Sequence, residues 1–112
     1  MLAQVNGTRL HYEIHGREGA PWLTLSHSLM CSARMWDPQL EALAGDFRIL
    51  AYDARGHGRS APTAPPYDFA LLAEDVFQLL RHLGIARTHY AGLSMGGMTG
   101  EALALAHPEA VD

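Results

Sequence analysis

The alternation of apolar and polar residues near the start of the chain predicts a β-hairpin. In residues 8–15, apolar side chains occupy every second position, which is the period of a strand with one buried face. A shorter segment, residues 3–5, in which Ala3 and Val5 are apolar, precedes Asn6-Gly7, a dipeptide typical of tight hairpin turns. We therefore expect the first two strands to pair antiparallel.

The rest of the pattern alternates between strands and helices. Short apolar runs predict strands that are buried on both faces, and apolar residues spaced three and four apart predict amphipathic helices. The longest predicted helix begins after Asp68 and ends before Gly84, and both residue types are common at helix ends. The expected order is strand 22–26, helix 38–44, strand 47–53, helix 69–83, strand 88–92 and helix 95–106.

Two opening strands followed by strand–helix units predict a single α/β domain over residues 1–112, with a mostly parallel sheet flanked by helices. The order of elements predicts that another strand begins near Val111. We therefore expect this chain to be the N-terminal part of a longer protein. The strand that ends at Gly92 is then expected to form an open apolar edge of the sheet.

Composition and charge narrow the choice of partners. The chain is 48% hydrophobic and 18% charged, which is ordinary for a soluble domain, and its eight basic residues are all arginine. With a net charge of −4 and no basic block, neither nucleic acid nor an anionic membrane is an expected partner. No signal peptide or membrane span is evident, so a cytoplasmic location is expected. Cys31 has no disulfide partner and is interpreted as a buried thiol.

The strongest chemical signal is a G-x-S-x-G motif, Gly92-Leu93-Ser94-Met95-Gly96, between a predicted strand and a predicted helix. This context is typical of a nucleophile elbow, in which Gly92 and Gly96 permit a sharp turn and Ser94 is held strained and exposed. The backbone N–H of Met95, at the helix start, is a candidate oxyanion donor. The alternative is an incidental glycine-rich turn. Met98, further along, is expected in the core.

A second oxyanion donor is expected in the loop Ser26-His27-Ser28-Leu29-Met30, and the backbone N–H of Leu29 is our candidate. His27 is expected to order this loop by hydrogen bonding and not to act as the base, because in this arrangement the base follows the nucleophile along the chain. Trp36 is expected to pack the next helix against the sheet. Lining of the pocket by Trp36 is the alternative.

Over essentially all of its length the sequence resembles the α/β-hydrolase superfamily. Residues Asp53–Ser60 match a D-x-R-G-H-G-x-S loop that many members carry, in which Asp53 and Arg55 are expected to fix the turn. The chain is most similar to 3-oxoadipate enol-lactonases, enzymes of aromatic catabolism, in which a serine like Ser28 precedes the leucine where most members have His-Gly. His27 departs from the asparagine usual there. The matching blocks are Leu25–Leu29, Met35–Leu40, Tyr52–Gly58 and Gly92–Met98.

The resemblance implies a serine hydrolase that acts on a small lactone or ester without a cofactor. Ser94 would attack the carbonyl carbon, and the N–H groups of Leu29 and Met95 would bind the oxyanion. The triad acid and histidine follow the serine in this fold, and the only histidine after Ser94 is His107, at the far end of the next helix. The 112 residues alone are therefore expected to be inactive, with the base and the substrate-covering cap beyond them.

Several alternatives stay open from the sequence. An acyltransferase, a perhydrolase or a haloperoxidase-like enzyme would use the same acyl-enzyme, and a non-catalytic binding module would use the same fold. The exact substrate and the oligomeric state are not predicted. His11, Glu13 and His15 share one strand face and could ligate a metal, but a solvated face is the favoured interpretation, so no metal is expected. Prolines after Gly56-His57-Gly58 exclude a dinucleotide-binding helix there.

Overall fold

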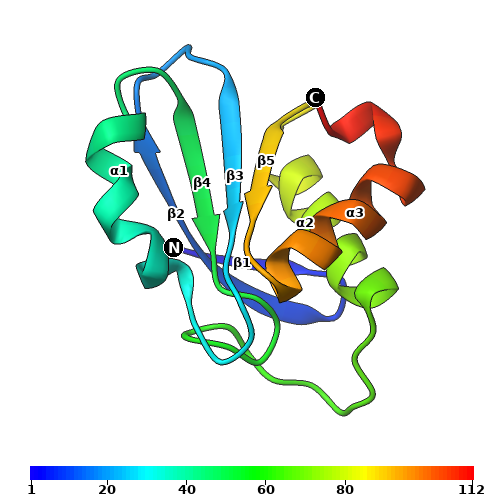
Figure 1. Cartoon of the computed structure of the whole chain (residues 1–112). Helices are drawn as coiled ribbons and strands as arrows, with labels where there is room; N and C mark the ends of the chain where they lie inside the picture. The colour runs from blue at the N-terminus through cyan, green and yellow to red at the C-terminus, as the bar shows by residue number, and fades with distance from the viewer.

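A computed structural model describes all residues, 1–112, as one mixed β-sheet with helices on both faces (Figure 1). The strands are β1 Leu2–Val5, β2 Thr8–Gly16, β3 Trp22–Ser26, β4 Arg48–Tyr52 and β5 His89–Gly92. The helices are α1 Asp37–Leu43, α2 Phe69–His82 and α3 Met95–Ala106, with short 3₁₀ turns η1 Ala33–Trp36 and η2 Pro108–Ala110. The hairpin and the six strands and helices predicted after it are all present, with ends that differ by at most one residue.

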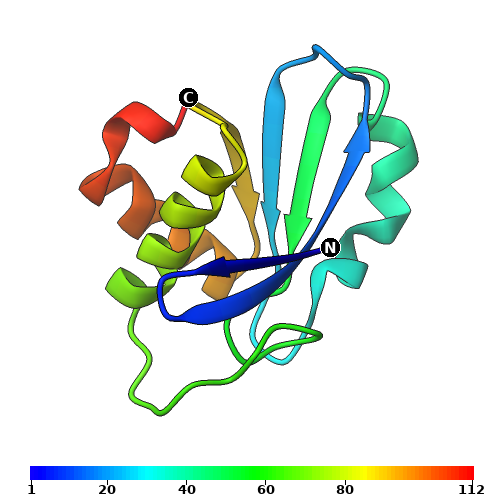
Figure 2. The same ribbon diagram turned by 180° about the vertical axis from the view of Figure 1, so that it is seen from behind.

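The strand order is β1-β2-β4-β3-β5. β4, β3 and β5 are parallel, whereas β2 pairs antiparallel with both β1 and β4. The predicted hairpin is confirmed, and its turn residues Asn6 and Gly7 have φ of 48° and 73°, the conformation that such a turn requires. The hairpin turn lies beside α2 (Figure 2), where the side-chain amide of Asn6 donates a hydrogen bond to Asp75 Oδ1 at 2.8 Å.

The two faces of the sheet bury separate apolar clusters because successive residues of a strand point to opposite sides. In β4, Leu50 joins the larger cluster under α2 and α3, together with Val76 and Leu103. Its neighbour Ile49 joins the smaller cluster, on which α1 packs. α2 begins as predicted, since the Asp68 carboxylate accepts a hydrogen bond from the Leu71 N–H at 2.8 Å.

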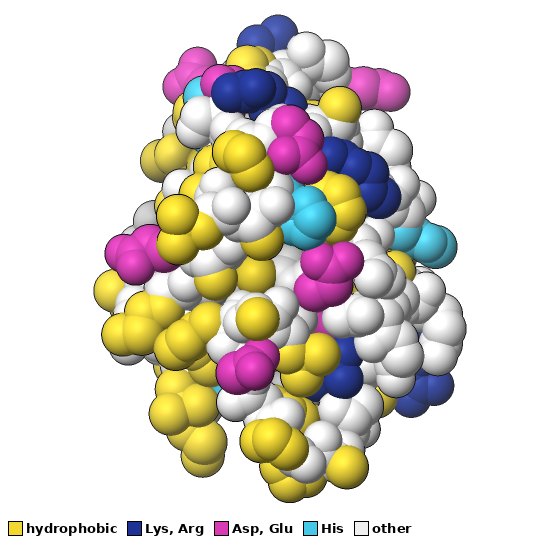
Figure 3. Space-filling view, turned by 90° about the vertical axis from the view of Figure 1, so that its right-hand side faces the viewer, with side chains coloured by type: hydrophobic (Ala, Val, Ile, Leu, Met, Phe, Trp, Pro, Cys, Tyr) yellow, Lys and Arg dark blue, Asp and Glu magenta, His cyan; other side chains and the backbone are white.

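β5 is one of the two edge strands of the sheet, and β1 is the other. Val111 forms an isolated parallel bridge with Thr88, at the position where a further strand was predicted to begin. Apolar side chains are exposed beside this edge, and hydrophobic atoms spread over the side of the molecule drawn in Figure 3. Met98 and Leu105 of α3 are 51% and 86% exposed. The prediction that Met98 lies in the core is therefore wrong, because it sits on the face of α3 that the sheet does not cover.

Two further predictions are corrected by the loops that follow β4 and β3. His11 is buried and not solvated, since this loop folds back over β2 and brings Asp53 Oδ2 to 3.4 Å from His11 Nδ1. The Ser60 hydroxyl of the same loop accepts from the His11 backbone N–H at 2.8 Å. Cys31 is exposed and not buried, because the turn after β3 projects away from the sheet.

A buried ion pair holds this loop, as predicted for Arg55. The Arg55 guanidinium donates to both carboxylate oxygens of Asp75 in α2, at 2.9 and 2.7 Å, and a further N–H donates to the Asn6 carbonyl at 2.8 Å. The hydrogen bonds to Asp75 raise the pKa of Arg55, so the guanidinium stays charged. Asp53 fixes the other side by accepting from the backbone N–H groups of Ala33 and Arg59.

We expect Asp75→Asn to lower the free energy of unfolding by about 3 kcal/mol, because it leaves the Arg55 guanidinium buried without its counter-charge. The matched control is Asp112→Asn, which breaks an ion pair with Arg87 whose two side chains are each at least half exposed, and should cost less than about 1 kcal/mol. Urea unfolding of both variants checks this. A loss below about 1 kcal/mol for Asp75→Asn would contradict the structural role of the pair.

Candidate active site

Ser94 occupies the sharp turn between β5 and α3, with φ 55° and ψ −112°. A residue other than glycine rarely adopts a positive φ, and such a conformation costs about 1–3 kcal/mol. The turn is held by the Leu93 N–H, which donates to the Ser26 carbonyl at 3.2 Å, and by the Gly96 N–H, which donates to the Leu93 carbonyl at 3.0 Å. Ser94 is thereby kept exposed at the carboxyl end of β5.

Glycine is required on both sides of this turn. A Cβ at Gly92 would collide with the backbone of Gly96 and Gly97. A Cβ at Gly96 would collide with the Ser26 carbonyl and would lie 2.8 Å from the His27 carbonyl oxygen. The start of α3 therefore packs directly on the backbone at the end of β3, so the serine turn and the loop after β3 are neighbours.

His27 makes hydrogen bonds that tie the loop after β3 to the loop after β4. Its Nδ1 lies 2.8 Å from the Ser28 carbonyl oxygen, which can only accept, so Nδ1 carries the proton. Nε2 then accepts from the Ala54 N–H at 2.8 Å. The ring is fully buried, and burial lowers the pKa of His27. Both ring nitrogens are occupied by the backbone, which leaves no lone pair for a proton from Ser94.

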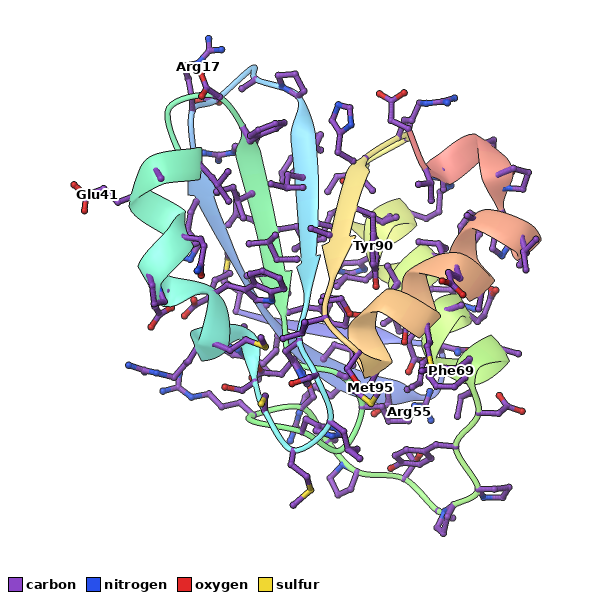
Figure 4. The ribbon with its side chains drawn as sticks, viewed as in Figure 1. Arg17, Glu41, Arg55, Phe69, Tyr90 and Met95 are labelled. Carbon is purple, nitrogen blue, oxygen red and sulfur yellow. The ribbon has the colours of Figure 1, made fainter.

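A cavity of about 360 Å³ opens beside Ser94, and it contains three of the predicted site residues, Leu29, Ser94 and Met95. Figure 4 shows Met95 and Phe69 at the neighbouring starts of α3 and α2, at one end of the sheet. The full lining is Leu29, His57, Tyr67, Asp68, Phe69, Leu72, Ser94, Met95 and Met98. An apolar cavity with a few polar groups is typical of a small-molecule site.

The structure keeps the other predicted residues outside the lining. His27 and Ser28 belong to the loop after β3 and do not line the cavity. Trp36 packs on the cluster formed by Leu23, Leu25 and Ile49 and is not among the residues that line the cavity.

The sequence did not predict the part of the cavity lining that comes from the loop between β4 and α2 and from the start of α2. His57 lies in the D-x-R-G-H-G-x-S loop and lines the cavity. This loop follows β4, which is parallel to β5, so it lies at the same end of the sheet as Ser94. That position in the sequence could have identified His57 as a residue near the site. Its Nδ1 lies 3.0 Å from the Arg55 carbonyl oxygen, so Nδ1 is the protonated nitrogen. The Tyr67 hydroxyl accepts from the Thr63 N–H at 2.8 Å and donates to the Thr63 carbonyl at 3.0 Å. Tyr67 therefore presents mainly its ring to the cavity.

His107 lies at the opposite end of α3 from Ser94. Its Nε2 lies 2.9 Å from the Glu74 carboxylate, and its ring stacks on Phe77 with 3.5 Å between centroids. The hydrogen bond from His107 lowers the pKa of Glu74. His107 is therefore occupied by α2 and is not placed to accept a proton from Ser94.

No three His, Cys, Asp or Glu side chains of the chain gather as a metal site would require. No helix of the chain combines the length and apolar character needed to cross a bilayer.

Comparison with known proteins agrees with this geometry. The family model described as alpha/beta hydrolase fold matches residues 14–112. This chain belongs to the alpha/beta hydrolase fold family. The crystal structure of an enol-lactonase from Burkholderia xenovorans superposes with a TM-score of 0.97 at 48% identity, over 100% of this chain and 44% of that one.

Two curated relatives in the same family differ in named activity. The protein named carbamate hydrolase RutD from Stutzerimonas stutzeri is 42% identical over 89% of this chain and 39% of its own length. The 3-oxoadipate enol-lactonase 1 of Acinetobacter baylyi is 39% identical over 88% of this chain and 37% of its own length. The chain thus spans about two fifths of the length of these relatives.

We expect Gly96→Ala to lower the free energy of unfolding by about 1–3 kcal/mol, because α3 must move away from β3 to make room for the new Cβ. Gly97→Ala is the matched control in the same helical turn. Its Cβ would meet only the Gly92 carbonyl group, with the oxygen at 3.4 Å and the carbon at 3.7 Å, and we expect a change within about 0.5 kcal/mol. Equal effects of the two substitutions, measured by urea unfolding, would disprove the close packing at Gly96.

The protonation of His27 gives a second prediction. Its folded-state pKa is lowered below the unfolded value of about 6.5, so as the pH falls through that value the unfolded chain takes up the proton first. The contribution of His27 to stability is therefore complete at neutral pH and is lost as the solution becomes more acidic. Nitrogen-15 NMR of the ring should report a neutral Nδ1–H tautomer at pH 7 and a titration midpoint below 6.5. An Nε2–H tautomer or a midpoint above 6.5 would contradict the assignment.

Proposed function

We propose that the full-length protein that carries this chain is a serine hydrolase of small carboxylic esters or lactones, with Ser94 as nucleophile. The observation that carries the proposal is the positive φ of Ser94, which holds its side chain at the mouth of an apolar cavity. Backbone strain of this kind persists where the surrounding packing enforces it, and here Gly92 and Gly96 provide that packing.

In the proposed reaction, Ser94 Oγ attacks the substrate carbonyl carbon while a base takes the hydroxyl proton. The carbonyl oxygen becomes an oxyanion that accepts hydrogen bonds from the backbone N–H groups of Leu29 and Met95. Two features support these donors. The Leu29 N–H makes no hydrogen bond in the chain, and Met95 is the first residue of α3, where N–H groups have no helical acceptor. Water then attacks the acyl-enzyme and releases the acid, without a cofactor.

The base and its orienting acid are proposed to lie outside these 112 residues. Two observations support this. His107 is bound by Glu74 far from Ser94, and the relatives are more than twice as long as the matched region. The 112 residues alone would then give only the residual rate that a serine and an oxyanion hole supply without a triad.

The proposed substrate is an enol-lactone of the 3-oxoadipate type. The support is the 48% identity to the Burkholderia enol-lactonase and the presence of 3-oxoadipate enol-lactonases among the relatives. Hydrolysis of a carbamate is the second candidate, because the 42% identical Stutzerimonas relative carries that name. The same acyl-enzyme would also serve an acyltransferase or a perhydrolase, and analysis of the products separates these from a hydrolase.

Steady-state hydrolysis by the full-length protein tests the proposal. We expect the enol-lactone to be hydrolysed faster than a carbamate of similar size, and Ser94→Ala to lower kcat by at least about 10⁴-fold because the nucleophile is lost. Glu41→Ala is the control, since Glu41 is exposed on α1 and does not line the cavity, and it should keep its activity. Turnover that survives Ser94→Ala would disprove the proposal, whereas a preference for the carbamate would change only the substrate.

A further inference from the structure

Two sulfur atoms contact Ser28 in the loop after β3. The Ser28 backbone N–H donates to Met35 Sδ at 3.4 Å, and the Ser28 hydroxyl donates to Cys31 Sγ at 3.2 Å and lies 4.0 Å from Met35 Sδ. Thioether sulfur is a weak hydrogen-bond acceptor. We therefore interpret the direction of the Ser28 N–H toward Met35 Sδ as a feature that the surrounding structure holds in place. Met35 comes from η1, seven residues further along the chain.

The two peptide groups that flank Ser28 are thereby fixed. The His27–Ser28 peptide is held through its N–H, which meets Met35 Sδ. The Ser28–Leu29 peptide is held through its carbonyl oxygen, which accepts from His27 Nδ1 at 2.8 Å and from the Cys31 N–H at 3.1 Å. A trans peptide is planar with its N–H opposite its C=O, so anchoring the Ser28 carbonyl sets the direction of the Leu29 N–H.

Packing does not hold the rest of this loop. Leu29 and Met30 are 61% and 87% exposed, and Met30 has a positive φ of 65°. The conformation of the loop therefore depends on hydrogen bonds to Ser28 more than on buried apolar contacts. Of these anchors, only Met35 contributes a side chain from outside the loop, and Met35 is in turn held by η1. The Ala33 N–H at the start of η1 donates to Asp53 Oδ1 at 2.7 Å.

We propose that Met35 is a positioning residue of the active site: its sulfur binds the Ser28 N–H and, by fixing the peptide before Ser28, limits the backbone rotation at Ser28 that would turn the Leu29 N–H away from the substrate oxyanion. The inference rests on the proposed function, because it assigns Leu29 as an oxyanion donor. It also gives Ser28 a structural role: its carbonyl and hydroxyl bind groups within the loop and its N–H binds Met35, which leaves the Leu29 N–H for the substrate.

The test compares Met35→Leu, which keeps the size of the side chain and removes the acceptor, with Met35→Gln, which restores an acceptor of similar reach. In the full-length protein we expect Met35→Leu to lower kcat about tenfold with little change in KM, which is less than the about hundredfold loss from complete removal of an oxyanion donor. Met35→Gln should recover most of kcat. Leu43→Met, an exchange of the same two residue types in α1, is the matched control and should not change kcat.

The outcomes separate the inference from the proposed function. Activity that persists in Ser94→Ala overturns the proposed function. If Ser94→Ala is inactive but kcat is unchanged in Met35→Leu, only the role of Met35 is overturned. The same holds if Met35→Gln folds but its kcat is no higher than that of Met35→Leu. If Met35→Leu does not fold, amide hydrogen exchange of the wild-type chain decides. Protection of the Ser28 amide supports the sulfur contact, and exchange at the rate of a free loop amide overturns it.

Discussion

The contact between Gly96 and the backbone at the end of β3 is the constraint on which the site depends. It brings the start of α3 against the carbonyls of Ser26 and His27, and it requires the chain between β5 and α3 to turn so sharply that Ser94 takes a positive φ. One close approach therefore produces both the exposed serine and its closeness to the loop after β3. A side chain at Gly96 would separate the two parts of the proposed oxyanion hole.

A second set of contacts passes through Asp53, at the end of β4. Its carboxylate accepts from Ala33 in η1 and from Arg59 in the loop before α2, so one buried side chain joins the two loops that surround Ser94. From η1 the connection continues through Met35 to Ser28. On the other side, the ion pair between Arg55 and Asp75 fixes the loop whose later residues, His57 and Tyr67, form the cavity wall.

The sequence predicts most of the fold because the signals are local. The hairpin follows from strict alternation and a turn dipeptide, α2 from apolar spacing and the Asp68 cap, and the elbow from five consecutive residues between a strand and a helix. What it misses depends on contacts between distant segments. The burial of His11, and the cavity wall from His57 to Leu72, both follow from the path of the loop between β4 and α2, which crosses over β2 and reaches the end of the sheet. The exposure of Met98 follows from the face of α3 that the sheet leaves uncovered.

The central claim, that the turn at Ser94 presents a reactive nucleophile, is tested most directly by covalent labelling. The full-length protein would be treated with a fluorophosphonate and digested, and the labelled peptide identified by mass spectrometry. The account predicts one equivalent of label on the peptide that contains Ser94. Label on a different residue, or undiminished labelling of the Ser94→Ala protein, would contradict it.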